Sequence, residues 1–191
     1  MPISVHNRRS CRFGLLIAAA LVAGCSSSTG GTVAFDEPSC SGDHAVKAHS
    51  FCFIQPPNLH REKSREIGDD EIALETDDKN VIDVRLGDIG VDTSTLSNSE
   101  LLDRMSREIA DRHSDSYQFD VDTGRFFYTA AGRALGFNGT GAASDGTGTL
   151  QENIIFHGSS MLQVICLWTD KEKDIRPGCT EILRSLKITA G

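Results

Sequence analysis

Alternating hydrophobic and polar positions predict a series of short β-strands along most of the chain after residue 50. Residues 51–54, 72–74 and 81–86 are rich in β-branched and aromatic side chains, which fit the half-buried surface of a sheet. Two later runs flank the turn at 157–160, and this pattern is typical of a β-hairpin. The full set of expected strands is 51–54, 72–74, 81–86, 117–122, 126–129, 133–138, 149–156 and 161–168.

A change from period two to helical spacing predicts a helix over residues 97–113. Ser97 followed by Glu100 is a capping-box pattern. Apolar side chains then recur on one face at Leu101, Leu102, Met105 and Ile109. A second, shorter helix is expected over 177–186, with Pro177 near its first turn, where a missing N–H costs little. Strands, a helix, antiparallel strands and a closing helix together predict an α+β domain in which both helices pack on an antiparallel sheet.

The first 24 residues have the pattern of a signal peptide. Residues 1–12 carry three Arg and no acidic residue, and an apolar run follows over 13–23. The sequence Val22-Ala23-Gly24-Cys25 resembles the bacterial lipobox, in which the cysteine is acylated through its sulfur and becomes the mature N-terminus. Cys25 is therefore the expected lipid attachment site. The alternatives are an uncleaved signal anchor, and ordinary secretion with a cysteine at this place by chance.

The remaining sequence divides into a tether and one domain. Residues 25–39 begin with a Ser/Gly-rich stretch that behaves as a flexible linker. Residues 40–191 then form the single α+β domain, in which the Gly-rich segment 139–148 is expected to be a loop.

Charge and hydropathy exclude two classes of protein. The full chain has 19 basic and 27 acidic residues and a net charge of −8, and removal of residues 1–24 makes it more acidic still. Nucleic-acid binding needs clustered Lys and Arg to neutralise phosphates, so a nucleic-acid partner is not expected. No apolar run approaches the roughly 18–20 residues that a membrane-spanning helix requires.

Four cysteines of the domain are expected to form disulfide bonds. An even number of cysteines in an exported domain favours disulfides, and three pairings are possible. We favour Cys40–Cys52, which fastens the start of the domain to its first strand, and Cys166–Cys179, which clamps the last helix to the sheet. The alternative for the first pair is a metal site, because His44 and His49 lie between Cys40 and Cys52.

None of the motifs that resemble catalytic or cofactor sites has the surroundings that such a site needs. The segment 120–124 starts like a calcium loop but lacks the required glycine and closing Glu. Gly139-Thr140-Gly141 is not followed by the helix of a dinucleotide fold, and Ser159 and Ser160 beside His157 lack a nucleophile elbow. The sequence therefore predicts neither an enzyme nor a resident cofactor or metal.

The order of elements over residues 50–189 resembles the Mog1/PsbP-like fold. The features that carry this resemblance are the Phe51–Phe53 strand that ends at Pro56-Pro57, the strand 81–86 followed by the helix 97–113, the segment 132–137, the hairpin that ends at 162–168, and the closing segment 182–188. Bacterial envelope lipoproteins of the LpqN type and DcrB-like proteins are similar in plan. Most proteins of this superfamily bind, stabilise or help to assemble other macromolecules, so the resemblance implies a binding or accessory module.

Together these observations predict a lipid-anchored protein of the bacterial cell envelope. The anchor is membrane lipid on Cys25, and the partner is an envelope protein or cell-wall component. Two other functions remain open. One is a carrier of lipid or another hydrophobic ligand, which requires a deep apolar pocket. The other is a hydrolase whose catalytic residues are distant in sequence, which requires a nucleophile and a base in one cleft.

Overall fold

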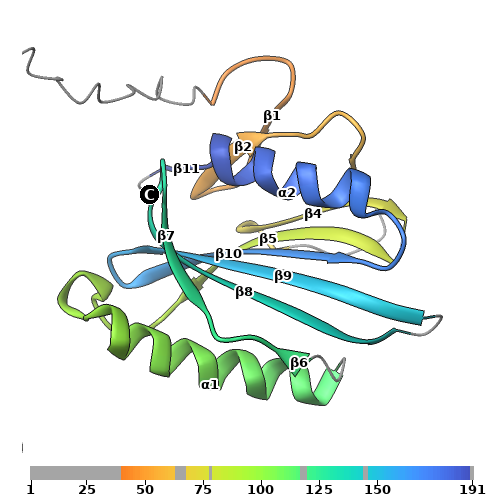
Figure 1. Ribbon diagram of the computed structural model, residues 1–191. Helices are drawn as coiled ribbons and strands as arrows, with labels where there is room; N and C mark the ends of the chain where they lie inside the picture. Colours follow the sequence, from red (N-terminus) through yellow and green to blue (C-terminus); the bar gives the residue numbers. More distant parts are fainter. Residues whose placement is uncertain (1–39, 63–67, 78, 117–119, 144–145, 190–191) are drawn as a thin grey trace, which may run out of the picture. The chain divides into compact units, whose positions relative to one another are not determined.

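The computed structural model describes residues 40–62, 68–77, 79–116, 120–143 and 146–189. The larger sheet contains β3 (His60–Arg61), β4 (Glu71–Asp77), β5 (Asn80–Asp88), β6 (Asp120–Val121), β7 (Arg125–Thr129), β8 (Gly132–Ala143), β9 (Gly146–His157) and β10 (Ser160–Trp168). The smaller sheet contains β1 (Ala45–Lys47), β2 (Phe51–Ile54) and β11 (Lys187–Ile188). A 3₁₀ turn η1 (Thr93–Thr95) and the helices α1 (Asn98–Ser116) and α2 (Glu172–Ser185) complete the described elements (Figure 1).

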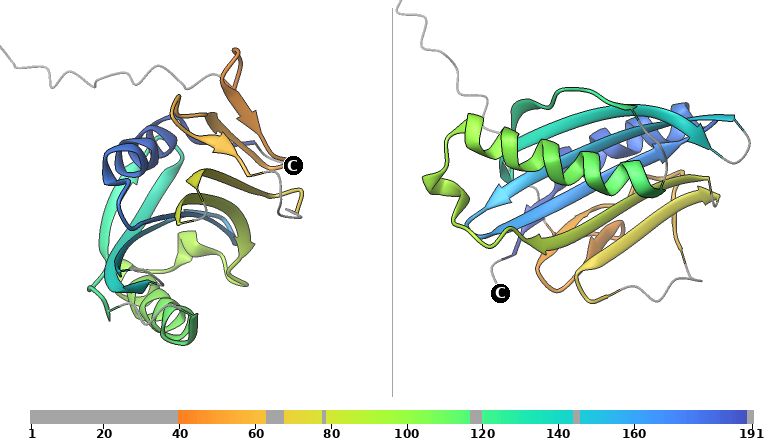
Figure 2. Two further views of the ribbon diagram at one scale, coloured as in Figure 1. Left: turned by 90° about the vertical axis from the view of Figure 1, so that its right-hand side faces the viewer. Right: turned by 90° about the horizontal axis from the view of Figure 1, so that it is seen from below.

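The larger sheet separates two helical layers. Its strand order is β3-β4-β5-β10-β9-β8-β6, with β7 also paired to β8, and all pairs are antiparallel. Helix α1 lies on one face of this sheet, whereas α2 and the smaller sheet lie on the other (Figures 1 and 2). The predicted α+β class, with helices packed on an antiparallel sheet, is confirmed. Within the described residues, neither helix combines the length and apolar character needed to cross a membrane.

Helix α1 begins as its capping box predicts. The Glu100 N–H donates to Ser97 Oγ (3.3 Å), and the Ser97 N–H donates back to Glu100 Oε2 (2.9 Å). The Ser97 hydroxyl also donates to this carboxylate, and these hydrogen bonds lower the pKa of Glu100. Three of the four expected apolar side chains, Leu101, Met105 and Ile109, are buried against β8, β9 and β10, and Leu102 is partly buried beside them.

Helix α2 is longer than predicted, and Pro177 lies inside it instead of at its start. Five residues precede the proline in the helix, and Glu172 and Asp174 in the first turn interact favourably with the helix dipole. The start is held by Asn80, whose side-chain oxygen accepts from the N–H of Lys171 (3.2 Å). Gly178 lets the helix approach the sheet closely, because a Cβ there would lie 2.9 Å from a methyl carbon of Leu59.

The strands of the central hairpin are longer than the sequence predicted. Residues 139–143 and 146–148 were expected to be loop, yet they extend β8 and β9, whose pairing runs from Ala134–Ile155 to Ala143–Gly146. Glycine and small polar residues have low strand propensity, but the neighbouring strand supplies the ladder hydrogen bonds that hold them extended. Of the expected strand over 117–122, residues 117–119 lie outside the described residues, and Asp120–Val121 forms β6.

Candidate functional site

The expected lipid attachment site, Cys25, lies outside the described residues, as do the predicted signal peptide and the tether up to residue 39. The four cysteines of the domain form two disulfide bonds, Cys40–Cys52 and Cys166–Cys179, consistent with the favoured pairing. Their Cα–Cα distances of 6.0 and 6.3 Å lie within the range that disulfides adopt. Cys166 and Cys179 are completely buried, and their bond joins β10 to the middle of α2.

The residues of the alternative metal site are not brought together as ligands. Both sulfurs are used in the Cys40–Cys52 bond, and His44 and His49 are exposed to solvent. Among the described residues, no group of three or more His, Cys, Asp or Glu side chains could hold a metal ion. The backbone carbonyl of His44 accepts from the Gln55 N–H (2.8 Å), so this segment is fastened to the end of β2 by its main chain.

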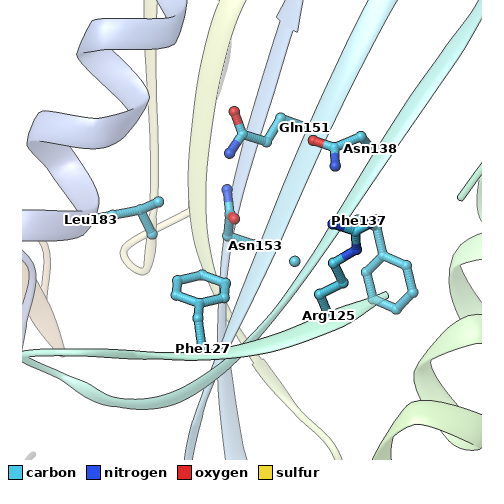
Figure 3. Close-up of a pocket in the computed structure, with 8 residues that line it drawn as sticks. Arg125, Phe127, Phe137, Asn138, Gln151, Asn153 and Leu183 are labelled. Carbon is cyan, nitrogen blue, oxygen red and sulfur yellow. The ribbon is translucent and has the colours of Figure 1, made fainter. Parts of the chain in front are cut away.

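A groove of about 280 Å³ lies where β7, β8 and β9 extend beyond the cover of α2 (Figure 3). Arg125 stands on one side of it, and Asn153 and Leu183 stand on the other. Leu183 comes from α2, so the helix supplies one wall and the sheet supplies the floor. The complete lining is Arg125, Phe127, Gly136, Phe137, Asn138, Gln151, Asn153 and Leu183.

The strand register explains how this groove forms. Arg125 on β7 pairs with Gly136 on β8, and Gly136 pairs with Asn153 on β9, so the three residues form one row across the sheet. Gly136 has no side chain, and the space between its two neighbours therefore stays open down to the backbone. A Cβ on Gly136 would lie 3.1 Å from Asn153 Oδ1 and 3.1 Å from Cε1 of Phe127.

The next row of the sheet adds two more carboxamides. Asn138 on β8 pairs with Gln151 on β9, one step along from the Gly136–Asn153 pair. The backbone N–H of Asn138 donates to Asp122 Oδ1 (2.8 Å), and its side-chain amide donates to Asp122 Oδ2 (3.3 Å). Asp122 therefore orients Asn138 at this end of the groove.

Asn153 is the buried polar group of the groove. Only 2% of its surface is exposed, and its amide nitrogen lies 3.9 Å from Sγ of Cys179. Sulfur is a weak acceptor, so this long contact satisfies little of the hydrogen-bonding capacity of the carboxamide. Phe127 and Leu183, both half-buried, form apolar walls beside it.

The chemistry of the groove is suited to recognition. A carboxamide presents a donor and an acceptor side by side, and a guanidinium presents a planar fork of donors. Neither group acts as a nucleophile or a general base at neutral pH. The groove can therefore hold a small polar ligand by hydrogen bonds and one charge, and can seat an apolar part of that ligand against Phe127 and Leu183.

The pattern of residues along the chain does not predict this groove. One signal was present: Gln151 and Asn153 occupy alternate positions of a predicted strand on the face that also carries Ile155. A carboxamide on an otherwise apolar strand face is costly to bury unless it has a hydrogen-bond partner, so its presence there indicates such a partner. Their position opposite Arg125 depends on the register of three strands, which the pattern does not specify.

No protein-family model and no curated protein matches the chain. Among solved structures, it is similar to the solution structure of cyanobacterial PsbP (CyanoP) from Synechocystis sp. PCC 6803, with a TM-score of 0.52 and 10% sequence identity over 78% of this chain and 97% of that one. It is also similar to the crystal structure of LpqN, described as involved in cell envelope biogenesis of Mycobacterium tuberculosis, with a TM-score of 0.48 and 12% identity over 73% and 83% of the two chains. The likeness to CyanoP confirms the PsbP-like fold expected from the sequence.

Proposed function

We propose that the protein is a lipid-anchored accessory module of the bacterial cell envelope, which binds its partner through the groove and catalyses no reaction. The observation that carries the binding role is the groove itself, in which a buried carboxamide and a guanidinium face an open space above Gly136. The lipobox-like sequence that ends at Cys25 supports the anchor. Two disulfide bonds support an oxidising, extracytoplasmic location.

A carrier of hydrophobic ligands is less well supported by the interior of the domain. Such a carrier needs an apolar cavity between the sheet and a helix. The space between α2 and the larger sheet is instead filled by fully buried side chains, including Ile82, Val164 and Ile182. An apolar ligand in the groove would also bury the amide of Asn153 without a new hydrogen-bond partner.

The anchor is tested by palmitate labelling in the native host. Cys25→Ser should abolish labelling, because the thioether needs the sulfur of Cys25. Cys11→Ser is the matched control, since Cys11 lies in the predicted signal peptide and should leave labelling unchanged. Undiminished labelling of the Cys25→Ser protein would overturn the lipid anchor.

The binding role is tested by a photo-crosslinking amino acid placed at one of two adjacent positions in living cells. Phe127 lines the groove, and Tyr128 points to the other face of the sheet and is 79% exposed. We expect a discrete crosslinked product from p-benzoylphenylalanine at position 127 and not at 128. The product from 127 should disappear when Gly136→Ala fills the groove floor, and its persistence would overturn the role of the groove.

A further inference from the structure

We propose that the groove binds the carboxylate end of a short peptide, with Arg125 pairing the carboxylate and Asn153 hydrogen-bonding the neighbouring peptide group. This inference rests on the proposed binding role of the groove and names the ligand class. It follows from three properties of the lining: an arginine available for a charge partner, a buried carboxamide directed into the open space, and apolar walls beside them.

Arg125 indicates that the ligand carries a negative charge. Its side chain is exposed at the groove in a protein of net charge −8, and within the described part of the chain no carboxylate forms an ion pair with it. A guanidinium matches the two oxygens of a carboxylate with two parallel hydrogen bonds. The other polar groups of the lining are neutral amides, so one negative charge on the ligand is enough to balance the site.

Asn153 indicates that the ligand contains a peptide group. Its carboxamide is 2% exposed and has, among the described residues, only the 3.9 Å contact with Cys179. A buried polar group without a good partner is costly, and a peptide group can supply both the donor and the acceptor that a carboxamide lacks. Gln151, in the next row, offers a second carboxamide to the same ligand.

The spacing of these groups fits a peptide terminus. Arg125 and Asn153 stand on strands separated by one strand, so their Cα atoms lie about 10 Å apart at the usual strand spacing. Both side chains extend toward the space between their strands. The space left between them matches one residue of a peptide, about 3.8 Å from Cα to Cα, so a terminal carboxylate can meet one side chain and the preceding peptide group the other. Phe127 and Leu183 then contact a small apolar side chain of the ligand.

The test uses the full-length protein purified in detergent and isothermal titration calorimetry. The probes are N-acetyl-alanyl-alanine with a free carboxylate and the same peptide with a C-terminal amide. We expect the free acid to bind roughly tenfold or more tightly than the amide, because a charge-assisted pair with Arg125 is lost in the amide. Using both the L,L and the D,D peptides distinguishes the two sources of this chemistry, a protein C-terminus and a cell-wall peptide.

Three variants locate the effect in the groove. Arg125→Gln should remove the preference for the free acid, and Gly136→Ala should abolish binding of both peptides by filling the floor. Gly87→Ala is the matched control, because Gly87 lies in β5, away from the groove, and the atoms nearest to a Cβ there belong to the flexible side chain and the carbonyl of Met161. Binding should survive in Gly87→Ala and in Arg61→Gln, an exposed arginine on β3.

Any of three results would overturn the inference. These are equal binding of the acid and the amide, an acid preference that survives Arg125→Gln, and tighter binding of the neutral sugar N-acetylglucosamine than of either peptide. A further outcome is that no peptide binds, while the crosslink at position 127 still forms in cells and is still lost in Gly136→Ala. In that case the peptide ligand is wrong and the binding role of the groove stands.

Discussion

Three carboxamides are buried among the described residues of this domain, and they differ in how the chain completes their hydrogen bonds. Asn80 is 1% exposed: its amide donates to Asp77 Oδ1 and Asp170 Oδ1, and its oxygen accepts from the N–H groups of Thr169 and Lys171. Four partners, at 2.7 to 3.2 Å, satisfy this side chain and fasten the β4–β5 turn to the start of α2.

Gln163, on the α1-facing side of the sheet, is satisfied in a similar way. Its oxygen accepts from Arg85 Nε (2.8 Å), and its amide donates to Glu152 Oε1 (3.2 Å). Asn153 lies on the opposite face of the same sheet, and its one hydrogen-bonding contact with a described side chain is the long one to the sulfur of Cys179. Polar groups that the chain satisfies itself are structural, whereas a buried carboxamide left open to a groove marks a place where a ligand can complete it.

The largest loss of stability is expected from Asn80→Leu. The change removes four hydrogen bonds, leaves two backbone N–H groups near the start of α2 without their acceptor, and should lower the free energy of unfolding by about 3 kcal/mol. Urea denaturation measures this loss. Asn58→Leu, at an exposed position where the amide donates one 3.4 Å hydrogen bond among the described residues, should cost less than about 0.5 kcal/mol. Similar values for the two variants would contradict the structural role of Asn80.

A smaller loss is expected from Gln163→Leu. Glu152 is completely buried and would lose the hydrogen bond from Gln163, so we expect a decrease of about 2 kcal/mol in the free energy of unfolding. Peptide binding in the groove should stay unchanged, because the groove lies on the other face of the sheet. If Gln163→Leu abolished peptide binding and left stability unchanged, Gln163 would be a ligand-binding residue and not a structural one.

Asn153→Leu should change stability by no more than about 1 kcal/mol in either direction, since the side chain has little hydrogen bonding to lose and its apolar replacement has similar volume. The same change should abolish peptide binding. Urea denaturation and calorimetry on one preparation measure both effects. A destabilisation as large as that of Gln163→Leu would show that Asn153 is a structural residue.

The smallest effect is a pH dependence at the Asp77–Asn80 contact. The hydrogen bond from Asn80 lowers the pKa of Asp77 below its value in the unfolded chain, and the bond from the Lys79 N–H adds to this. The resulting stability is present above the unfolded pKa, about 3.9, and is lost as the pH falls through the lower folded pKa. Thermal unfolding between pH 6 and pH 2 should show a shallower acid dependence in Asp77→Asn than in the unchanged protein. An unaltered slope would exclude this linkage.

The sequence was sufficient to predict the elements that local patterns encode. The capping box placed the start of α1 within one residue, and apolar alternation located the central strands. The smaller sheet was not predicted as a sheet. Its strands β1 and β11 have three and two residues, too few for a periodic signal, and β11 pairs with β2 from the other end of the chain.

The groove could not be predicted for a related reason. Arg125, Gly136 and Asn153 come from three strands, and a slip of one residue in either pairing would turn a side chain to the opposite face. That register depends on the pairing of the whole sheet and on the apolar side chains packed on both of its faces. The start of α2 was misplaced because a proline at the first helical position is the more common arrangement, and here favourable acidic residues extend the helix before Pro177.

The disulfide between β10 and α2 has a consequence for the time course of folding. Cys166 and Cys179 have no exposed surface, so an oxidant can reach neither sulfur once α2 has packed on the sheet. The two thiols must therefore meet their oxidant before α2 has docked on the sheet. Oxidation and helix docking are thus in kinetic competition, and the yield of the correctly oxidised protein depends on which of the two steps is faster.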